Sequence, residues 1–289
     1  MLIDSHCHLD THHLPAGPDA VIERAIAAGV GGLVCVGVGG DPAPARFAVA
    51  LAERRADVVA VVGLHPHEAS AGSPAFFDEL ASLVRRERVI AVGEIGLDYH
   101  YDFSPRDVQR EVFRRMIALA HEVKKPIVIH TREASDDTLQ ILEDEGARAL
   151  GGVFHCFSED VAFARKALDL GFDISLSGIV TFPKATALHE VARFVPSDRY
   201  YVETDSPYLA PVPFRGKKCE PAYVAHTARR IAELRGVAFE QVAQETSANV
   251  IRRFGLSRDT LGGFLAGAER VHREMGDLEG DVAGSRDTR

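Results

Sequence analysis

Short apolar runs alternate with longer segments of mixed polarity along most of the chain. The apolar runs are Leu2–Asp4, Gly32–Val36, Val59–Gly63, Val89–Gly93, Pro126–Ile129, Gly152–Phe154, Phe172–Leu176 and Tyr200–Val202. Such runs, bounded by glycine, proline or polar side chains, are typical of strands buried on both faces of a parallel sheet. The pattern therefore predicts eight strands.

The segments between these runs have the apolar spacing of amphipathic helices, and two show it most clearly. One follows Ser104 and Pro105, which we expect to supply an N-cap and a proline in the first turn. Its apolar residues are Val108, Val112, Met116, Leu119 and Val123. The other covers residues 239–254, and Gly255 stands just past its end as a C-cap.

Repeated alternation of strand and helix predicts an α/β fold, and the count of eight strands favours a (β/α)8 TIM barrel. An open, doubly wound sheet would also alternate strands with helices. We expect residues 1–255 to form the barrel domain. Residues 256–289 are a C-terminal extension, in which Gly262, Gly263 and Gly267 weaken an amphipathic helix. Its polar end, residues 279–289, is expected to be disordered.

Composition and charge argue against several classes of protein. The net charge of −9 disfavours nonspecific coating of nucleic acid, which needs a broad surface of lysine and arginine. No apolar stretch is long enough to cross a bilayer, and no signal-like segment opens the chain. The four cysteines lack CxxC spacing. We expect a cytoplasmic monomer with reduced thiols and without a membrane partner.

Two histidines separated by one residue follow the first apolar run. Successive side chains of a strand point to opposite faces, so His6 and His8 point the same way and can bind one cation. In a parallel barrel every strand delivers its last residues to one common face. The other polar candidates at strand ends are Glu94, His130, His155 and Asp205.

Imidazole and carboxylate ligands without thiolates suit zinc, manganese or magnesium. Six such residues exceed the needs of one catalytic ion, so we predict two divalent ions about 3.5–4 Å apart. In this hypothesis the first histidine pair and Asp205 bind one ion, His130 and His155 bind the other, and Glu94 bridges them. A water shared by the ions is the nucleophile, and Asp205 can accept its proton.

Of the remaining histidines, two follow a predicted strand and are candidates for the site, whereas the others are not. His65 and His67, after the third run, are expected to line the pocket and touch substrate, and Asp4 to orient a ligand histidine. We read the others as structural or surface residues. They are His12, His13, His100, His121, His189, His226 and His272.

Basic residues on the loops after the strands indicate the charge of the substrate. Arg132 follows His130, Lys184 follows the seventh strand, and Arg215 follows the eighth. A positive rim around two cations suits an anionic substrate, most simply a phosphodiester. Lys217 and Lys218 fit this rim, and they fit a solvated loop equally well.

Five stretches together resemble the TatD family of metal-dependent deoxyribonucleases, which belongs to the wider group of amidohydrolase-like barrels. They are Asp4–Asp10, Gly93–Tyr99, Pro126–Ala134, Phe154–Phe157 and Glu203–Leu209. The resemblance implies a divalent-metal hydrolase that acts on DNA, as an exonuclease on single strands. It implies as ligands His6, His8, Glu94, His130, His155 and Asp205.

Two other functions fit the same residues. The same pair of ions could activate water against another ester or an amide, for example the ester of an aminoacyl-RNA, because the chemistry is not specific to one bond. A barrel that keeps its metal only as a scaffold would bind ions without turnover. A substrate screen separates these alternatives from DNA hydrolysis.

Overall fold

The computed structural model of the chain describes residues 1–10, 14, 16–257 and 259–264. Its eight strands form one sheet in the order of the sequence, and all neighbouring strands are parallel. The strands are β1 (Leu2–Cys7), β2 (Val30–Gly37), β3 (Val58–Val62), β4 (Val89–Asp98), β5 (Ile127–Arg132), β6 (Gly152–Phe154), β7 (Phe172–Leu176) and β8 (Tyr200–Val202). This sequential order identifies the (β/α)8 barrel and rules out the open, doubly wound sheet.

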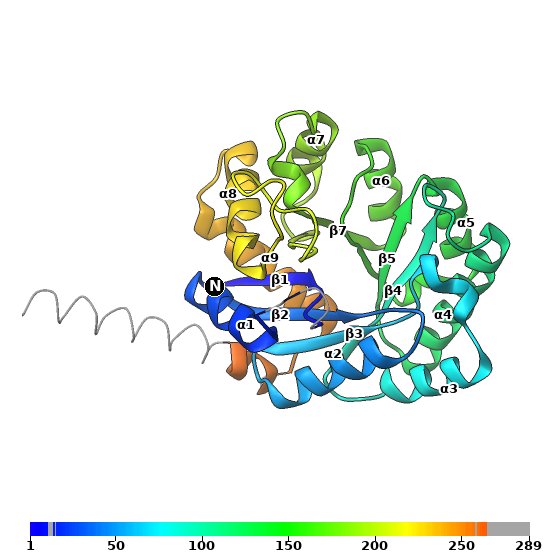
Figure 1. Cartoon of the computed structure of the whole chain (residues 1–289). Helices are drawn as coiled ribbons and strands as arrows, with labels where there is room; N and C mark the ends of the chain where they lie inside the picture. Colours follow the sequence, from blue (N-terminus) through cyan, green and yellow to red (C-terminus); the bar gives the residue numbers. More distant parts are fainter. Residues whose placement is uncertain (11–13, 15, 258, 265–289) are drawn as a thin grey trace, which may run out of the picture.

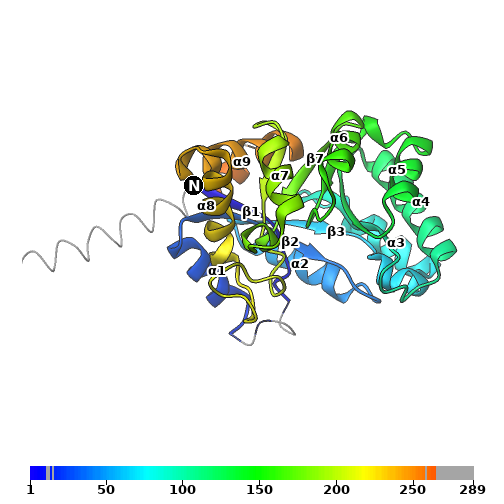
Figure 2. The ribbon, with the colours of Figure 1, turned by 90° about the horizontal axis from the view of Figure 1, so that it is seen from above.

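Helices surround the strands on the outside of the barrel (Figure 1 and Figure 2). The α-helices are α1 (Pro18–Ala27), α2 (Ala43–Arg54), α3 (Pro74–Leu83), α4 (Arg106–Val123), α5 (Ser135–Asp144), α6 (Val161–Asp169), α7 (Thr186–Phe194), α8 (Val224–Arg235) and α9 (Phe239–Phe254). Short 3-10 helices are η1 (Pro66–Ala71), η2 (Ala147–Ala149), η3 (Gly178–Thr181) and η4 (Pro221–Tyr223). Among the residues described, no helix combines the length and the apolar character that a membrane span requires.

The last three predicted strands coincide with the observed ones, whereas β1, β4 and β5 run further than their apolar runs. The added residues include the polar side chains of His6, Glu94 and His130, which interrupt the apolar run although the strand itself continues. The helix cap predicted at Ser104 is wrong. Helix α4 begins at Arg106 with Pro105 as N-cap, and the Ser104 hydroxyl instead accepts from Ser70 N and donates to His67 O.

Two separate apolar layers stabilise the barrel. The larger lies between the strands and the outer helices. The smaller fills the inside of the barrel, and its members include Ile3, Val34, Val61, Val128, Val153 and Tyr201. Val250 and Phe254 of α9 belong to this inner layer, which they close from the amino-terminal ends of the strands.

Residues after Gly255 also take part in this closure. Residues 259–264 are helical, and Phe264 is fully buried in the inner layer. A Cβ added to Gly32 on β2 would lie 2.4 Å from the Phe264 ring, so glycine is needed for this close approach. The beginning of the predicted extension is therefore part of the barrel core. Residues 265–289, which include the stretch predicted to be disordered, lie outside the described residues.

The ring closes where β1 meets β8, near the carboxyl ends of both strands. His8 N donates to Ser206 O at 2.8 Å, and Asp205 N donates to His6 O at 2.9 Å. These two bonds join the first strand to the segment after the last. They therefore place the first histidine pair beside Asp205.

A buried carboxylate reinforces this junction from inside. Asp4 accepts hydrogen bonds from Thr204 N at 2.9 Å and from Thr204 Oγ1 at 2.6 Å. It also accepts from His6 N at 3.4 Å. The expectation that Asp4 orients a ligand histidine is thus modified, because its recorded hydrogen-bond donors are two backbone amides and a hydroxyl rather than an imidazole ring.

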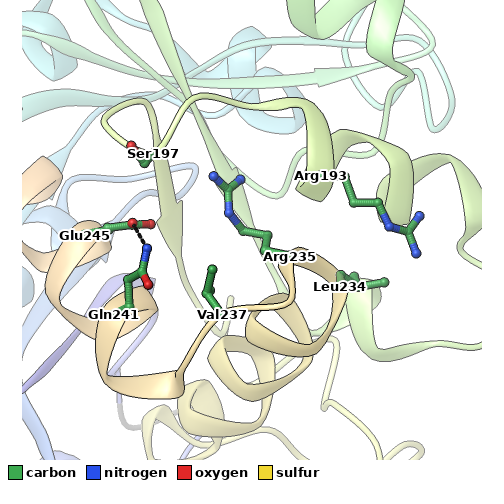
Figure 3. Close-up of a pocket in the computed structure, with 7 residues that line it drawn as sticks. All are labelled: Arg193, Ser197, Leu234, Arg235, Val237, Gln241 and Glu245. Atoms are coloured by element: carbon green, nitrogen blue, oxygen red, sulfur yellow. Dashed lines mark hydrogen bonds between the residues drawn. The ribbon is translucent and has the colours of Figure 1, made fainter.

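A cavity of about 400 Å³ opens between α7, α8 and α9 (Figure 3). It is lined by Arg193, Ser197, Leu234, Arg235, Val237, Gln241 and Glu245. Arg235 donates to two backbone carbonyls and lies over the Tyr200 ring, while Glu245 accepts from Tyr200 and Gln241. The cavity lies at the amino-terminal ends of the strands, the face that stabilises TIM barrels. We assign it no part in the chemistry.

Replacing Phe264 with alanine tests whether the extension is part of the core. We expect Phe264→Ala to lower the free energy of unfolding by about 3–5 kcal/mol, because the inner layer loses a buried ring that the strands cannot replace. Urea unfolding measures the loss. Asp259→Ala, an exposed position of the same helical segment, should stay within about 0.5 kcal/mol of wild type. Equal midpoints for Phe264→Ala and wild type would contradict the assignment.

Asp4→Ala tests the junction between β1 and β8. The variant leaves the Thr204 amide and hydroxyl buried without their acceptor, at a cost of about 1–3 kcal/mol for each group. Denaturant unfolding should show this loss. Thr204→Ser keeps the hydroxyl and removes only a methyl group, so we expect a cost of about 1 kcal/mol. If both variants lost the same free energy, packing rather than hydrogen bonding would explain the effect.

Candidate metal centre

A cluster of imidazoles and carboxylates lies at the carboxyl ends of the strands, with Glu94 of β4 at its centre. Glu94 Oε1 lies 2.6 Å from His155 Nε2, 2.9 Å from His130 Nδ1 and 3.3 Å from His65 Nε2. Glu94 Oε2 faces the opposite side, 3.4 Å from His6 Nε2. The two oxygens of one buried carboxylate therefore serve two groups of histidines, which is the geometry that a bridging ligand requires.

Glycine allows β4 and β5 to bring Glu94 and His130 together. Gly96 has a φ of +141°, and a Cβ at this position would lie 1.9 Å from the His130 carbonyl oxygen. Any other residue would force the two strands apart. The backbones of β4 and β5 therefore approach each other closely at Gly96.

His6, His8 and Asp205 form one group of potential ligands, as predicted. Their ligand atoms lie within 4.8 Å of one another, and Asp205 Oδ1 is 3.8 Å from His6 Nε2 and 3.6 Å from His8 Nε2. His8 Nδ1 lies 3.2 Å from the Val36 carbonyl oxygen. Because a carbonyl only accepts, His8 Nδ1 carries a proton. His8 Nε2 faces Asp205, and although burial opposes a charged ring, the Asp205 carboxylate raises the pKa of His8.

The second group differs in membership from the sequence hypothesis. The structure groups His130 and Glu94 with His65, whose ligand atoms again lie within 4.8 Å of one another. His65 was expected to line the pocket and touch substrate. His155 also contacts Glu94, but its ring stacks on that of His6 with centroids 3.9 Å apart, so it lies between the two groups.

Glu203, directly after β8, is a candidate that the sequence analysis missed. It is fully buried, its Oε1 accepts from Cys156 N at 2.6 Å, and the same oxygen lies 3.4 Å from His155 Nδ1. Together with His6 and His155 it makes a third group with metal-binding geometry. Its spacing of two from Asp205 was the available signal, since the same spacing singled out the first histidine pair.

Asp98, the last residue of β4, is a second residue that was missed. Its Oδ2 lies 3.0 Å from both His67 Nε2 and His130 Nε2. Burial opposes ionisation of Asp98, but hydrogen bonds from His130, His67 and Tyr101 N hold its pKa below the ordinary range. Asp98 therefore positions two imidazoles at once. Its spacing of four from Glu94, on the same strand face, could have indicated it.

The carboxylates of the cluster and His6 have the protonation states of metal ligands. His8, His65 and His155 differ, because nearby carboxylates outweigh burial and raise the pKa of these rings, so a bound cation would displace their protons. Burial opposes ionisation of Glu94, yet attraction to His155 and His65 holds its pKa well below the ordinary value. Burial also opposes ionisation of Asp205, and the His8 and His155 side chains lower its pKa. Burial and the neighbouring His155 lower the pKa of His6, which keeps that ring neutral. Ionised carboxylates and a neutral imidazole are the forms that bind metal.

Unsatisfied polar atoms mark the centre of the cluster. Within the part of the chain that the structure describes, the ring nitrogens of His6 and of His155 and Glu203 Oε2 are buried without a well-aligned hydrogen bond, although His155 Nε2 lies close to Glu94 Oε1. Buried polar atoms without a partner are costly and rare. A cation satisfies lone pairs of this kind, so the residues present fit a divalent metal.

The residues predicted to contact substrate lie at the end of β5 and on the segments that follow β3, β7 and β8. His67 contacts His65, and the Arg132 guanidinium lies 4.8 Å above the Tyr101 ring. On loops after β7 and β8, Lys184 is exposed and Arg215 lies 4.4 Å above the Phe182 ring. Each residue therefore lies at the carboxyl end of a strand or on the segment after it, as predicted.

The histidines read as structural have other partners. His189 Nε2 lies 3.1 Å from Val180 O, His121 Nε2 lies 2.9 Å from Glu145 O, and His100 pairs with Glu133. His226 contacts the Phe214 ring. The three other members of this set lie outside the described residues: His12, His13 and His272.

Comparison with known proteins agrees with this site. The sequence model of the family described as "TatD related DNase" matches residues 3–255. The uncharacterized metal-dependent hydrolase YabD of Bacillus subtilis is 42% identical over 257 residues, which cover 89% of this chain and 100% of that protein. A Klebsiella pneumoniae protein named 3'-5' ssDNA/RNA exonuclease TatD is 32% identical over 260 residues, with 88% and 98% covered.

A solved structure agrees as well. The TatD homologue YJJV of Escherichia coli K12 superposes with a TM-score of 0.81 at 29% identity, covering 89% of this chain and 98% of that one. The family model, which matches residues 3–255, covers all eight strands apart from Leu2 and the whole cluster around Glu94. This chain is a metal-dependent hydrolase and belongs to the TatD family.

Proposed function

We propose that this protein is a nuclease that hydrolyses phosphodiester bonds of DNA, removing nucleotides from single-stranded ends. The observation that carries the proposal is Glu94, whose two oxygens face separate groups of histidines at the open face of the barrel. This arrangement is suited to two ions acting on one phosphate. The exonuclease name of the Klebsiella pneumoniae relative supports the choice of DNA.

We further propose that two divalent ions, zinc, manganese or magnesium, bind between these residues. His6, His8 and Asp205 would bind one, His65 and His130 the other, with Glu94 shared and His155 between them. Bound ions supply Lewis acidity and lower the pKa of a coordinated water. Asp205, an ionised carboxylate at the edge of the cluster, is the residue we assign to accept the proton of that water.

The surrounding side chains would bind and orient the DNA. His67 lies against His65 of the cluster, Arg132 is the last residue of β5, and Arg215 lies on the loop after β8. Arginine pairs well with phosphate because its planar donors match two oxygens. Lys184 adds a positive charge on the loop after β7. Contact with DNA would be transient, because a net charge of −9 opposes broad binding.

Cytoplasmic location and a monomeric state stay predictions from the sequence. The four cysteines are free, which fits a reducing compartment.

Glu94→Gln tests the bridging role of this carboxylate. With manganese or zinc at about 100 times the dissociation constant, we expect wild type to gain about 2.7 kcal/mol of stability, because the ions bind the folded state. Glu94→Gln should bind at least one ion fewer and lose most of this gain. Elemental analysis and calorimetry measure both quantities. The exposed Glu133→Gln is the matched control. Retention of two ions by Glu94→Gln would exclude a bridging role.

His130→Ala tests the reaction itself. We expect this variant to degrade end-labelled single-stranded DNA at least about 100-fold more slowly, because the transition state loses several kcal/mol of charge stabilisation. His121→Ala, an exposed histidine of α4, should match wild type. A panel that includes duplex DNA, an aminoacyl ester and an amide completes the test. Turnover of esters without turnover of DNA would favour the ester hydrolase, and bound metal without any turnover would favour a scaffold.

A further inference from the structure

Two aromatic side chains stand exposed on the loop between β4 and α4, next to the metal cluster. Phe103 is 67% exposed and Tyr101 is 48% exposed. A phenylalanine ring that stays about two-thirds exposed contributes little to the core, and large exposed apolar groups near a site are typical of ligand contacts.

The two rings form an ordered unit. They stack with centroids 5.2 Å apart and an angle of 15° between their planes. The His67 ring contacts both edge-on, 5.3 Å from Tyr101 and 4.9 Å from Phe103. Since His67 itself contacts His65, the stacked pair is joined to the candidate metal ligands through one imidazole.

The loop that carries the rings is fixed by the residue that positions the cluster. Asp98 Oδ1 accepts from Tyr101 N at 2.9 Å and from His100 N at 3.0 Å, while Asp98 Oδ2 contacts His67 and His130. On the other side of Phe103, Ser104 Oγ donates to His67 O at 2.8 Å. The exposed rings are therefore anchored by hydrogen bonds at both ends of a short loop.

A positive charge completes this surface. The Arg132 guanidinium lies 4.8 Å from the centroid of Tyr101, and in the described part of the chain no carboxylate forms an ion pair with it. A ring face beside an unneutralised guanidinium matches the two parts of a nucleotide, the flat base and the anionic phosphate.

We propose that Tyr101 and Phe103 form a stacking platform for an unpaired base of single-stranded nucleic acid, with Arg132 contacting a neighbouring phosphate. The inference rests on the proposed function and deepens it, because it names the feature that selects single strands. A base in a duplex has both faces covered by its neighbours, so the platform requires a base that has left the stack. Stacking does not read sequence, since every base offers a π-face.

The test compares binding of two fluorescent oligonucleotides, oligothymidylate and the same backbone with abasic sites, by anisotropy in calcium buffer. Wild type should bind the thymine oligonucleotide more tightly. Phe103→Ala should weaken binding of the thymine oligonucleotide about 10- to 100-fold and remove most of the preference over the abasic one. Phe103→Trp preserves a ring and should keep the preference. Phe103→Leu preserves apolar character without a π-face and should lose it.

Other outcomes separate this inference from the proposed function. If wild type cleaves single-stranded DNA and Phe103→Ala binds both oligonucleotides as wild type does, the platform is wrong while the nuclease stands. If wild type cleaves no oligonucleotide but the preference still depends on Phe103, the platform stands and the nuclease is wrong. A change of sedimentation from dimer to monomer in Phe103→Ala, with unchanged binding, would instead identify the rings as a contact between copies.

Discussion

The arrangement of the site depends on the junction between the first and the last strand. Two backbone hydrogen bonds, His8 N to Ser206 O and Asp205 N to His6 O, bring together residues separated by about two hundred positions of sequence. Asp4 secures the same place through Thr204. Without this closure the histidines of β1 would have no carboxylate partner from β8, and Glu94 would face a single group of imidazoles. The hydrogen bonds that close the barrel between β1 and β8 are therefore the same bonds that bring the residues of the cluster together.

The two ends of the barrel differ in their role: one holds the polar cluster, and the other stabilises the fold. At the carboxyl ends, buried carboxylates and imidazoles are packed together with ring nitrogens of His6 and His155 left without well-aligned hydrogen bonds, an arrangement that costs stability unless a cation is bound. At the amino-terminal ends, Phe254 and Phe264 close the inner apolar layer. There Asp173 accepts hydrogen bonds from Arg253 and Tyr201. Burial by itself would raise the pKa of Asp173, but these two donors lower it. The apolar closure and the paired Asp173 at the amino-terminal ends stabilise the fold, whereas the cluster at the carboxyl ends opposes it unless a cation is bound.

Much of the fold was accessible from local pattern. Apolar runs located every strand, and β6, β7 and β8 matched to the residue, because strands buried on both faces are rich in apolar side chains. In β7 the match held although Asp173 and Ser175 are buried polar residues. The pattern failed where a strand continued into the site, as in β4, since the polar ends of such strands look like loops. It also failed at Ser104, whose hydroxyl bonds to the η1 segment instead of capping α4. Phe264 was placed in a weak extension because nothing local indicates that its ring enters the barrel.

The sequence by itself determined the barrel, the face at which the chemistry lies and the residue types that supply it, because strand period and strand count are local properties. Only the tertiary structure decided how those residues are grouped. His65 joined Glu94 and His130, Glu203 joined His6 and His155, and Asp98 tied His67 to His130. Tyr101 and Phe103 likewise became a stacked pair beside Arg132. These groupings depend on distances between strands that are far apart along the chain, and such distances are set by closure of the ring and by the close approach of β4 to β5 at Gly96.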